Sequence, residues 1–300
     1  MIKNIKKNKF VLIILNYNTS NDTIDLINSV ARNKNDYSDV DVVIVDNAST
    51  DGSGSLLFDM YANNQNINVI KNTKNLGFAS GNNVGYKYAM TLNPDFIIFS
   101  NSDVLLNREY TFDNISRIYK EKKFAILGPD VYNPLSMIHQ SPLYMDTKVD
   151  QNFIKKRQIY LAMNEVRIFL SIFFPKIINS LVKQHKKKNE RKRKAEKYQS
   201  NVAIHGCFIV FSKKYMETFT CGICDQTFMY GEEDLLLYFC QNNNLTIAYD
   251  PSLQIHHYEG KSSAKVGENF YQTAKFKQNN MKNSMFVLKH YITNKIKIWY

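Results

Sequence analysis

Short apolar runs that end abruptly in polar side chains are the feature that most constrains the fold of this chain. Three of them, KFVLIILNYN (9–18), VDVVIVDN (40–47) and FIIFSNSDV (96–104), are rich in β-formers and shorter than a typical helix. Continuously apolar strands are typical of a parallel sheet that is covered on both faces. We therefore expect an α/β fold with a doubly wound, mostly parallel sheet, whose polar strand ends gather at one edge.

The segments between these runs alternate with them in the expected way. Ile24, Leu26, Ile27 and Val30 approximate helical spacing after a possible N-cap at 20–22. A third short strand is predicted at 67–72. The segment 75–90 begins as a Gly/Asn loop and becomes a helix with its apolar face at Val84, Tyr88 and Ala89.

The polar strand ends carry side chains suited to a nucleotide. Asn101 and Asp103 are two residues apart, so in an extended segment both would face one ligand. Their oxygens are ligands that Mg²⁺ or Mn²⁺ accepts. The sequence lacks G-x-G-x-x-G after its first strand and lacks G-x-x-x-x-G-K-[ST] altogether, so a cation on Asp103 is the expected counter-charge for a diphosphate. Taken singly, each polar end could equally cap a turn.

Composition adds a basic surface and few other constraints. The net charge is +12, which suggests a polyanionic neighbour such as phosphorylated substrate, anionic lipid or nucleic acid. The apolar run at 10–15 is too short for a signal peptide, and no apolar stretch reaches the length of a membrane span, so we expect a cytoplasmic protein. Cys221 and Cys224 have redox or zinc-site spacing, but without a second such pair we interpret them as structural filler.

A basic insert interrupts the α/β pattern over 134–200. Residues 159–182 are rich in large apolar side chains, and 183–197 contain nine Lys/Arg against two Glu. We interpret 159–197 as a surface that docks on anionic membrane, because lipid attracts such segments. A core-packed helix followed by a solvated basic helix is the alternative. We expect the C-terminal residues 281–300 to form either a second amphipathic contact with the membrane or a helix that packs on the domain.

Several motifs together resemble a known family. LNYN, VDNASTDGS, NLGFASGNN, SNSDV, GCFIVFSKKYM, DQTFMYGEEDLLLYF and IHHYEGKSS occur in the order seen in family 2 glycosyltransferases, and the match is similar to the bacterial rhamnosyltransferase-like branch that builds surface polysaccharides. It covers about two-thirds of the chain, by the matched segments, and fails over 134–200 and the last thirty residues. The resemblance implies a GT-A fold, a nucleotide-sugar donor, a divalent cation (Mn²⁺ or Mg²⁺) and inverting transfer. It implies a glycosyltransferase domain at 1–267, made of a nucleotide-binding half (1–130), the insert (134–200) and a catalytic half (201–267), with a helical tail at 268–300.

The resemblance also implies which side chains bind the donor. The expected contacts are Asn16, Tyr17, Asp46, Asn47, Gly77, Phe78, Asn82 and Asn101. Asp46 would accept a hydrogen bond from the imide N–H of uracil or thymine, so a UDP-sugar and a dTDP-sugar suit it equally.

Asp103 and His257 are the expected metal ligands. Asn101 stands where the family usually has its first Asp, so the metal claim depends on Asp103. Adjacent histidines on a strand face opposite sides, and the spacing to Ser262 favours His257 over His256.

Glu232 and Glu233 fall where the family has its Glu-Asp pair. A carboxylate is a suitable base for an acceptor hydroxyl, and the oxocarbenium-like transition state resembles that of glycoside hydrolysis. We expect Glu233 to be the base and Glu232 to position the acceptor. Acidic residues also favour helix N-termini, so Glu233 and Asp234 as helix caps are the alternative. Three adjacent acids repel, which favours a raised pKa at one of them.

The predicted function is therefore an inverting, metal-dependent hexosyltransferase that acts on a glycan, in particular a lipid-linked one, at the inner face of the plasma membrane. A nucleic-acid-binding protein is the main alternative, but no zinc-finger, helix-turn-helix or RNP signature supports it. An inactive nucleotide-sugar scaffold is disfavoured by the carboxylate at Glu233. A nucleotidyltransferase would need a basic glycine-rich loop near the N-terminus, which the sequence lacks.

Overall fold

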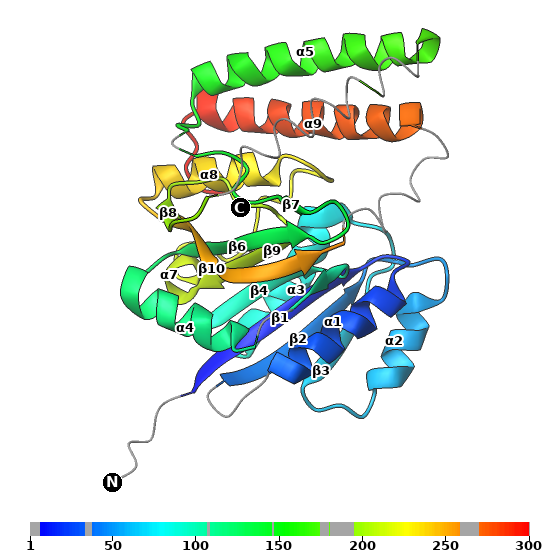
Figure 1. The fold of residues 1–300 in the computed structure, drawn as a ribbon, viewed down its shortest axis with the longest axis vertical. Coiled ribbons are helices and arrows are strands. Elements are labelled where there is room, and N and C mark those ends of the chain that lie inside the picture. Colours follow the sequence, from blue (N-terminus) through cyan, green and yellow to red (C-terminus); the bar gives the residue numbers. More distant parts are fainter. Residues whose placement is uncertain are drawn as a thin grey trace.

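The computed structural model describes residues 7–33, 38–106, 109–145, 147–174, 180, 195–258 and 270–299. A central sheet is flanked by helices, and two long helices form a further layer at one end of the molecule (Figure 1). The strand order along the sheet is β3 (Ile67–Lys71), β2 (Ser38–Asp46), β1 (Asn8–Asn16), β4 (Phe96–Asn101), β9 (Phe208–Ser212), β6 (Ile126–Asn133), β10 (Ile247–His257) and β5 (Val104–Leu105). Two short strands extend it: β7 (Ile138–His139) pairs with β6, and β8 (Gln199–Ser200) pairs with β10.

The first half of the sheet is parallel, as the apolar runs predict. Strand β1 lies between β2 and β4, and its side chains alternate between two cores on opposite faces. Phe10, Leu12 and Ile14 pack with helices α1 (Ser20–Asn33) and α4 (Thr111–Lys122), whereas Val11 and Ile13 pack with α3 (Gly77–Thr91). Burial on both faces explains why β1 contains no alternating polar residues.

The structure differs from the sequence analysis at two points in this half. Helix α2 (Ser53–Tyr61) follows β2 in a segment for which no helix was predicted, and α3 begins at Gly77, where the start of 75–90 was expected to be a loop. Gly77 has φ +79°, and a Cβ there would lie 2.3 Å from the Phe228 carbonyl oxygen. The small residues that look like a loop therefore form a helix start because a second segment packs closely against them.

The second half mixes strand directions. Strand β9 is antiparallel to both β4 and β6, and β10 is parallel to β6 with a shift of register between Asp250 and Gln254. After this shift β10 pairs antiparallel with β5, which places His257 opposite Val104. Residues 153 positions apart in the chain thus become neighbours at the edge where β1, β2 and β4 also end.

Helices α5 (Gln151–Phe173) and α9 (Phe270–Thr293) lie side by side in the outer layer, above α8 (Glu232–Asn242) (Figure 1). Asp150 caps α5 by accepting from the N–H groups of Asn152 and Phe153. After the short helix α7 (Lys213–Met216) comes Phe219, and its ring stacks on Trp299, with 4.3 Å between centroids. The C-terminal segment thus packs on the domain, which was one of its two predicted roles.

None of the described helices is long and apolar enough to cross a membrane. Helix α5 covers the first part of the predicted membrane-docking segment. Most of the predicted basic stretch, residues 183–194, lies outside the described residues.

Candidate active site

The ends of β1 and β2 form a buried polar pair. Asn16 pairs with Asp46 in the sheet register, and its Nδ2 donates to Asp46 Oδ1 at 2.7 Å. The backbone N–H and the hydroxyl of Ser49 also donate to Asp46, and Gly54 lies directly against its carboxylate. Thr19 and Thr23 donate to Asn16 Oδ1. This network fixes the Asp46 carboxylate at the sheet edge. Tyr17 follows in the same loop and is half-buried.

Asn47, predicted as a donor contact, instead organises the loop before α3. Its Nδ2 donates to Asn75 Oδ1 and to the Gly77 carbonyl, and its Oδ1 accepts from Asn72 Nδ2 and Leu76 N–H. These four hydrogen bonds use the full capacity of a carboxamide. Asn47 is therefore a positioning residue in this structure.

Helix α3 joins the first half of the site to the second. The N–H of Phe78 donates to the Phe228 carbonyl at 2.7 Å, and Asn83 exchanges two hydrogen bonds with the backbone of Ile223. The segment that precedes Glu232 is thereby held over the start of α3. Asn82 Nδ2 donates to the Phe78 carbonyl, and its buried Oδ1 has no partner among the described residues, which leaves an acceptor for a ligand.

The two glutamates at the start of α8 differ in their surroundings. Glu232 is buried and accepts from the Thr227 hydroxyl at 3.1 Å. Burial, followed by the charge of Glu233, raises the pKa of Glu232 to about 8. Burial also raises the pKa of Glu233, while the Gly206 N–H that donates to it lowers that pKa. Gly206 lies so close to Glu233 Oε1 that a Cβ there would be 2.9 Å away, with the Phe78 ring nearby.

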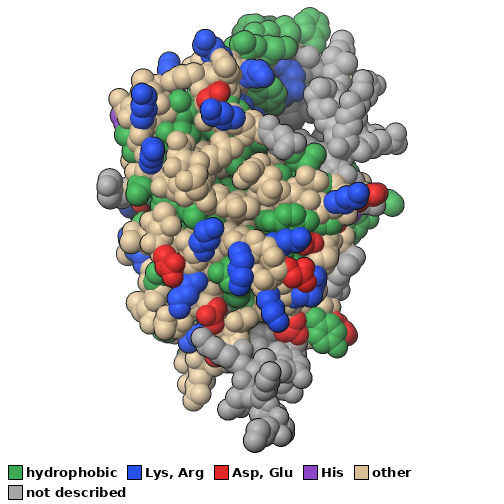
Figure 2. Space-filling view, turned by 90° about the vertical axis from the view of Figure 1, so that its left-hand side faces the viewer, with side chains coloured by type: hydrophobic (Ala, Val, Ile, Leu, Met, Phe, Trp, Pro, Cys, Tyr) green, Lys and Arg blue, Asp and Glu red, His purple; other side chains and the backbone are tan. Residues whose placement is uncertain are grey.

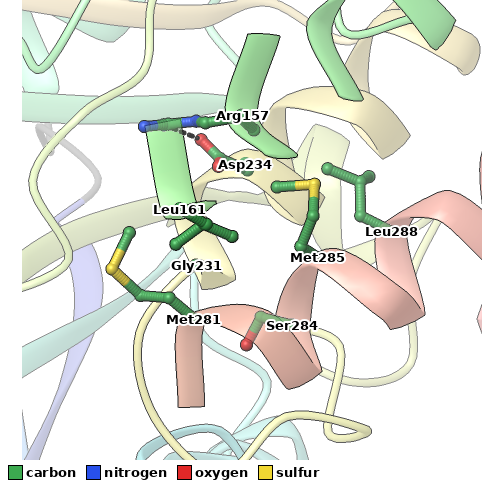
Figure 3. Close-up of a pocket in the computed structure, with 8 residues that line it drawn as sticks. All are labelled: Arg157, Leu161, Gly231, Asp234, Met281, Ser284, Met285 and Leu288. Carbon is green, nitrogen blue, oxygen red and sulfur yellow. Dashed lines mark hydrogen bonds and ion pairs between the residues drawn. The ribbon is translucent and has the colours of Figure 1, made fainter. Parts of the chain in front are cut away.

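Asp234 belongs to a different cluster. Its carboxylate accepts from Arg157 of α5 at 2.9 Å and from the Tyr144 hydroxyl. Figure 3 shows this ion pair beside Leu161 and the α9 side chains Met281, Ser284, Met285 and Leu288. The N-cap of α8 is Gly231, which has no side chain to cap the helix, and Glu233 and Asp234 lie in the first turn, so the capping alternative stays a prediction.

Asp103 and His257 meet where β5 and β10 pair. His257 Nε2 lies 3.3 Å from Asp103 Oδ1, and both side chains are buried. His257 Nδ1 contacts Gln140 Oε1 at 2.8 Å, which fixes the ring and directs Nε2 toward Asp103. His256 faces away and packs against Tyr132. The Asp103 carboxylate and the His257 imidazole, which the Gln140 carboxamide orients, are suitable ligands for a divalent cation.

The reason given for Asp103 from the sequence was wrong. Strand β4 ends at Asn101, and Ser102 and Asp103 form a turn, so the two-residue alternation of a strand does not apply. The Ser102 and Thr19 hydroxyls are hydrogen-bonded at 2.8 Å, which ties this turn to the loop after β1. Asn101 is half-buried, and its N–H donates to the Cys207 carbonyl. Ser262, used to choose between the histidines, lies outside the described residues.

The structure adds His205 and Cys207, which the sequence analysis did not select. Ligand atoms of His205, Cys207 and His257 all lie within 4.8 Å of one another. Burial lowers the pKa of His257, but Cys207 and Asp103 together raise it more strongly, to about 11. The intervening Gly206 contacts Glu233, so the tripeptide 205–207 joins the glutamates to the Asp103–His257 pair. In the sequence, the only signal was a His and a Cys two residues apart before a buried strand.

Comparison with solved structures supports the fold that the sequence analysis predicts. The crystal structure of S. aureus TarS 1–349 in complex with UDP matches 96% of this chain and 75% of that chain, at 15% identity and a TM-score of 0.52. The crystal structure of S. aureus TarS matches 93% of this chain and 43% of that chain, also at 15% identity and a TM-score of 0.52. TarS 1–349 in complex with UDP-GlcNAc matches over 42% of this chain and 35% of that chain, at 27% identity and a TM-score of 0.37. In two of these matches the chain thus spans less than half of the neighbour's length.

These likenesses confirm a GT-A type of fold. The comparison with curated proteins gave no significant match. The family model described as "Glycosyl transferase family 2" matches residues 11–219, which is more than half of the chain. The match starts in β1, includes β4 and its Asp103 turn, and ends at Phe219, just before the segment that leads to Glu233. This chain belongs to glycosyl transferase family 2.

Proposed function

We propose that this chain transfers a sugar from a UDP- or dTDP-sugar to a glycan of the cell surface, with inversion at the anomeric carbon. The observation that carries the proposal is the tripeptide 205–207. It contacts the Glu233 carboxylate through Gly206 and the His257 imidazole through Cys207. The catalytic base and the ligands of a cation that would bind the diphosphate are thereby held close together, as sugar transfer requires. The S. aureus TarS structure in complex with UDP supports a uridine nucleotide as ligand.

The residues suggest a single displacement. The Asp46 carboxylate accepts from the imide N–H of the base, and the diphosphate lies toward Asp103 and His257. A divalent cation bound there would neutralise the charge that develops on the leaving diphosphate. Glu233 removes the proton of the acceptor hydroxyl, whose oxygen bonds to the anomeric carbon while the bond from that carbon to the diphosphate oxygen breaks.

Glu233 must be ionised to act as this base. The N–H of Gly206 favours its ionised form, while burial and Asp234 oppose it. Burial raises the pKa of Glu232 as well, to about 8. A protonated Glu232 would remove one of the three negative charges in the first turn of α8 near neutral pH, which reduces the repulsion that opposes ionisation of Glu233. We assign Glu232 to positioning of the acceptor and the base.

We further propose that the enzyme works at the inner face of the plasma membrane on a lipid-linked acceptor. Helix α5 packs one side on α9 through Leu161 and Ile168, yet its other side exposes large apolar side chains: Ile159, Tyr160, Met163, Val166, Phe169, Ile172 and Phe173. Figure 2 shows apolar atoms with interspersed Lys and Arg at the end of the molecule where α5 lies. The apolar helix face suits the hydrocarbon boundary of a bilayer. The segment 183–197 that follows in sequence carries a charge of +7, which suits anionic lipid headgroups.

The nucleotide site is tested by calorimetric titration of the full chain with UDP and with dTDP, each with Mn²⁺, with Mg²⁺ and with EDTA. We expect each metal to strengthen nucleotide binding. The nucleotide that binds more tightly, UDP or dTDP, identifies the donor class. Asp46→Asn should weaken binding with or without metal, and Asp103→Ala should remove only the metal-dependent part. Asp59→Asn, exposed on α2, is the control. If neither nucleotide binds under any of these conditions, the proposed function is wrong.

A further inference from the structure

Cys207 occupies an unusual position for a structural thiol. It is buried at the start of β9, and its carbonyl accepts from the N–H of Asn101 at the end of β4. Asp103 follows Asn101 by two residues, so this backbone bond fixes Cys207 beside the Asp103 turn. The Cys207 sulfur interacts with the His257 imidazole, and the ligand atoms of these two residues lie within 4.8 Å.

The imidazole of His257 is oriented toward this point. Its Nδ1 lies 2.8 Å from Gln140 Oε1, an atom that can only accept, so Nδ1 carries a proton and donates. Nε2 therefore faces Asp103 Oδ1, at 3.3 Å, and Cys207, and it can bind a metal there once its proton is released. An imidazole held in this way by an outer carbonyl oxygen is the usual arrangement of a metal-binding histidine.

His205 flanks the cluster without the same orientation. Its ring packs edge-on against His257, with 5.3 Å between centroids, and its Nδ1 accepts from the Cys207 N–H at 3.1 Å. An Nδ1 that accepts implies that the proton is on Nε2, which leaves no lone pair there for a metal. We assign His205 to positioning of Cys207 and His257.

We propose that Cys207 binds the metal ion as a thiolate, together with His257 and Asp103, and that this site therefore selects Zn²⁺ or Co²⁺ over Mg²⁺. Thiolate and imidazole are preferred by these borderline ions, whereas Mg²⁺ takes oxygen ligands. Three protein ligands leave coordination positions open for diphosphate oxygens, as in catalytic zinc sites. On binding, the Cys207 thiol and the Nε2 of His257 would each release a proton to solvent, and the sulfur and Nε2 would bond to the ion. The inference rests on the proposed nucleotide-sugar site and specifies its ion.

Cobalt provides a direct test, because a thiolate ligand gives Co²⁺ an intense near-ultraviolet charge-transfer absorption that oxygen and nitrogen ligands do not give. Titration of the reduced full chain with Co²⁺ should produce this band together with the visible d–d bands. Zn²⁺ should abolish both by displacement, and a large excess of Mg²⁺ should leave them unchanged.

Variants then assign the band. Cys207→Ala should abolish the charge-transfer band and weaken Zn²⁺ binding at least about tenfold, since loss of even an outer partner costs about 10- to 100-fold. Cys221→Ser, a half-buried thiol outside the cluster, should keep both. Circular dichroism checks the fold of each variant. If Cys207→Ala does not fold, the wild-type spectrum with and without Zn²⁺ still decides whether a thiolate is bound.

Wild-type protein that shows d–d bands without the charge-transfer band would overturn the inference, as would a band that persists in Cys207→Ala. Metal-strengthened UDP or dTDP binding in the same samples would leave the proposed function standing in either case. The proposed function fails separately, by absence of nucleotide binding with every ion.

Discussion

Glu232 and Glu233 are consecutive carboxylates, and what distinguishes them is the backbone that each one meets. Glu233 lies against the Gly206 N–H, while Glu232 is buried against the Thr227 hydroxyl. Burial raises the pKa of both carboxyls, but the Gly206 N–H and the charge of Lys277 both lower the pKa of Glu233, whereas Glu232 has only neutral donors. At the scale of single residues, the additional cation favours Glu233 as the base.

The role of Glu233 is tested by Glu233→Gln. The amide keeps the shape but cannot accept a proton, so turnover should fall by about 10²- to 10⁴-fold while nucleotide affinity is unchanged. Turnover is measured as nucleoside diphosphate released from the donor identified by titration, and affinity by calorimetry. Glu121→Gln, exposed near the end of α4, is the control. Near-normal turnover in Glu233→Gln would show that another group is the base.

Glu232 should make stability depend on pH. Its pKa is raised from 4.5 to about 8 in the folded chain, so folding favours the protonated form. This stabilising contribution is fully present below about pH 4.5 and is lost as pH rises through about 8. Between these values the free energy of unfolding of the wild type should fall relative to Glu232→Gln by up to about 1.4 kcal/mol per pH unit.

Urea denaturation of the wild type and Glu232→Gln at several pH values measures this difference. Glu121→Gln again serves as control, because an exposed carboxylate should give a difference that varies little with pH. A constant difference for Glu232→Gln across the range would mean that its carboxyl is not held neutral in the folded state.

The residues of the site were predictable to different degrees. Asp46 ends a strand that is visible in the sequence, Asp103 lies in the turn after another, and the family motif predicted Glu232 and Glu233. Asn47 looked equally suitable as a donor contact, but the loop 72–77 takes up all its hydrogen bonds. The role of Cys207 could not be predicted from the residues around it, because its partners His257 and Asp103 are far away in sequence and meet it only through strand pairing.

At the scale of elements, helices α5 and α8 are joined by a partly buried ion pair between Arg157 and Asp234. Arg157 and Asp234 lie 2.9 Å apart, and the Arg157 guanidinium also packs over the Tyr144 and Phe153 rings. Figure 3 shows the pair between α5 and the apolar side chains of α9. Asp234 directly follows Glu233, so this contact connects the outer helical layer to the segment that carries the base.

Removal of Arg157 should therefore be costly. Arg157→Met leaves Asp234 buried and without its cation, which typically destabilises a protein by about 3–5 kcal/mol. Glu165→Gln is the matched control: it breaks the ion pair of Glu165 with Lys282, which also joins α5 to another helix but is exposed. That change should cost less than about 1 kcal/mol. Urea denaturation measures both, and equal effects would contradict the structural role of Asp234.

The elements themselves were predictable where burial is two-sided. Strands β1, β2 and β4 and helix α1 carry strong apolar patterns. Helix α2 was missed because it begins with Ser and Gly, which favour turns in isolation, and buries few side chains. The antiparallel insertion of β9 between β4 and β6 could not be read from the sequence, because it depends on which apolar strands pair.

At the scale of the whole molecule, the exposed apolar face of α5 lies in the outermost layer (Figure 1). Phe169 and Phe173 illustrate it: their rings touch at 5.5 Å between centroids, yet the residues are 58% and 62% exposed. Exposed apolar side chains clustered on one helix face mark an interaction site more often than scattered ones do. The net charge of +12 favours an anionic partner for this face.

Vesicle sedimentation tests whether that partner is a bilayer. The full chain should bind vesicles of phosphatidylglycerol and phosphatidylcholine, bind pure phosphatidylcholine much less, and dissociate as salt screens the attraction. Phe169→Ser combined with Phe173→Ser should weaken binding at least about tenfold, because each Phe can contribute about 1.5–3 kcal/mol when buried. Leu135→Ser, which is 80% exposed in the loop between β6 and β7, should not. If the double variant binds vesicles normally, or if the face instead mediates a concentration-dependent dimer in analytical ultracentrifugation that the double variant abolishes, then α5 is not the membrane-docking surface.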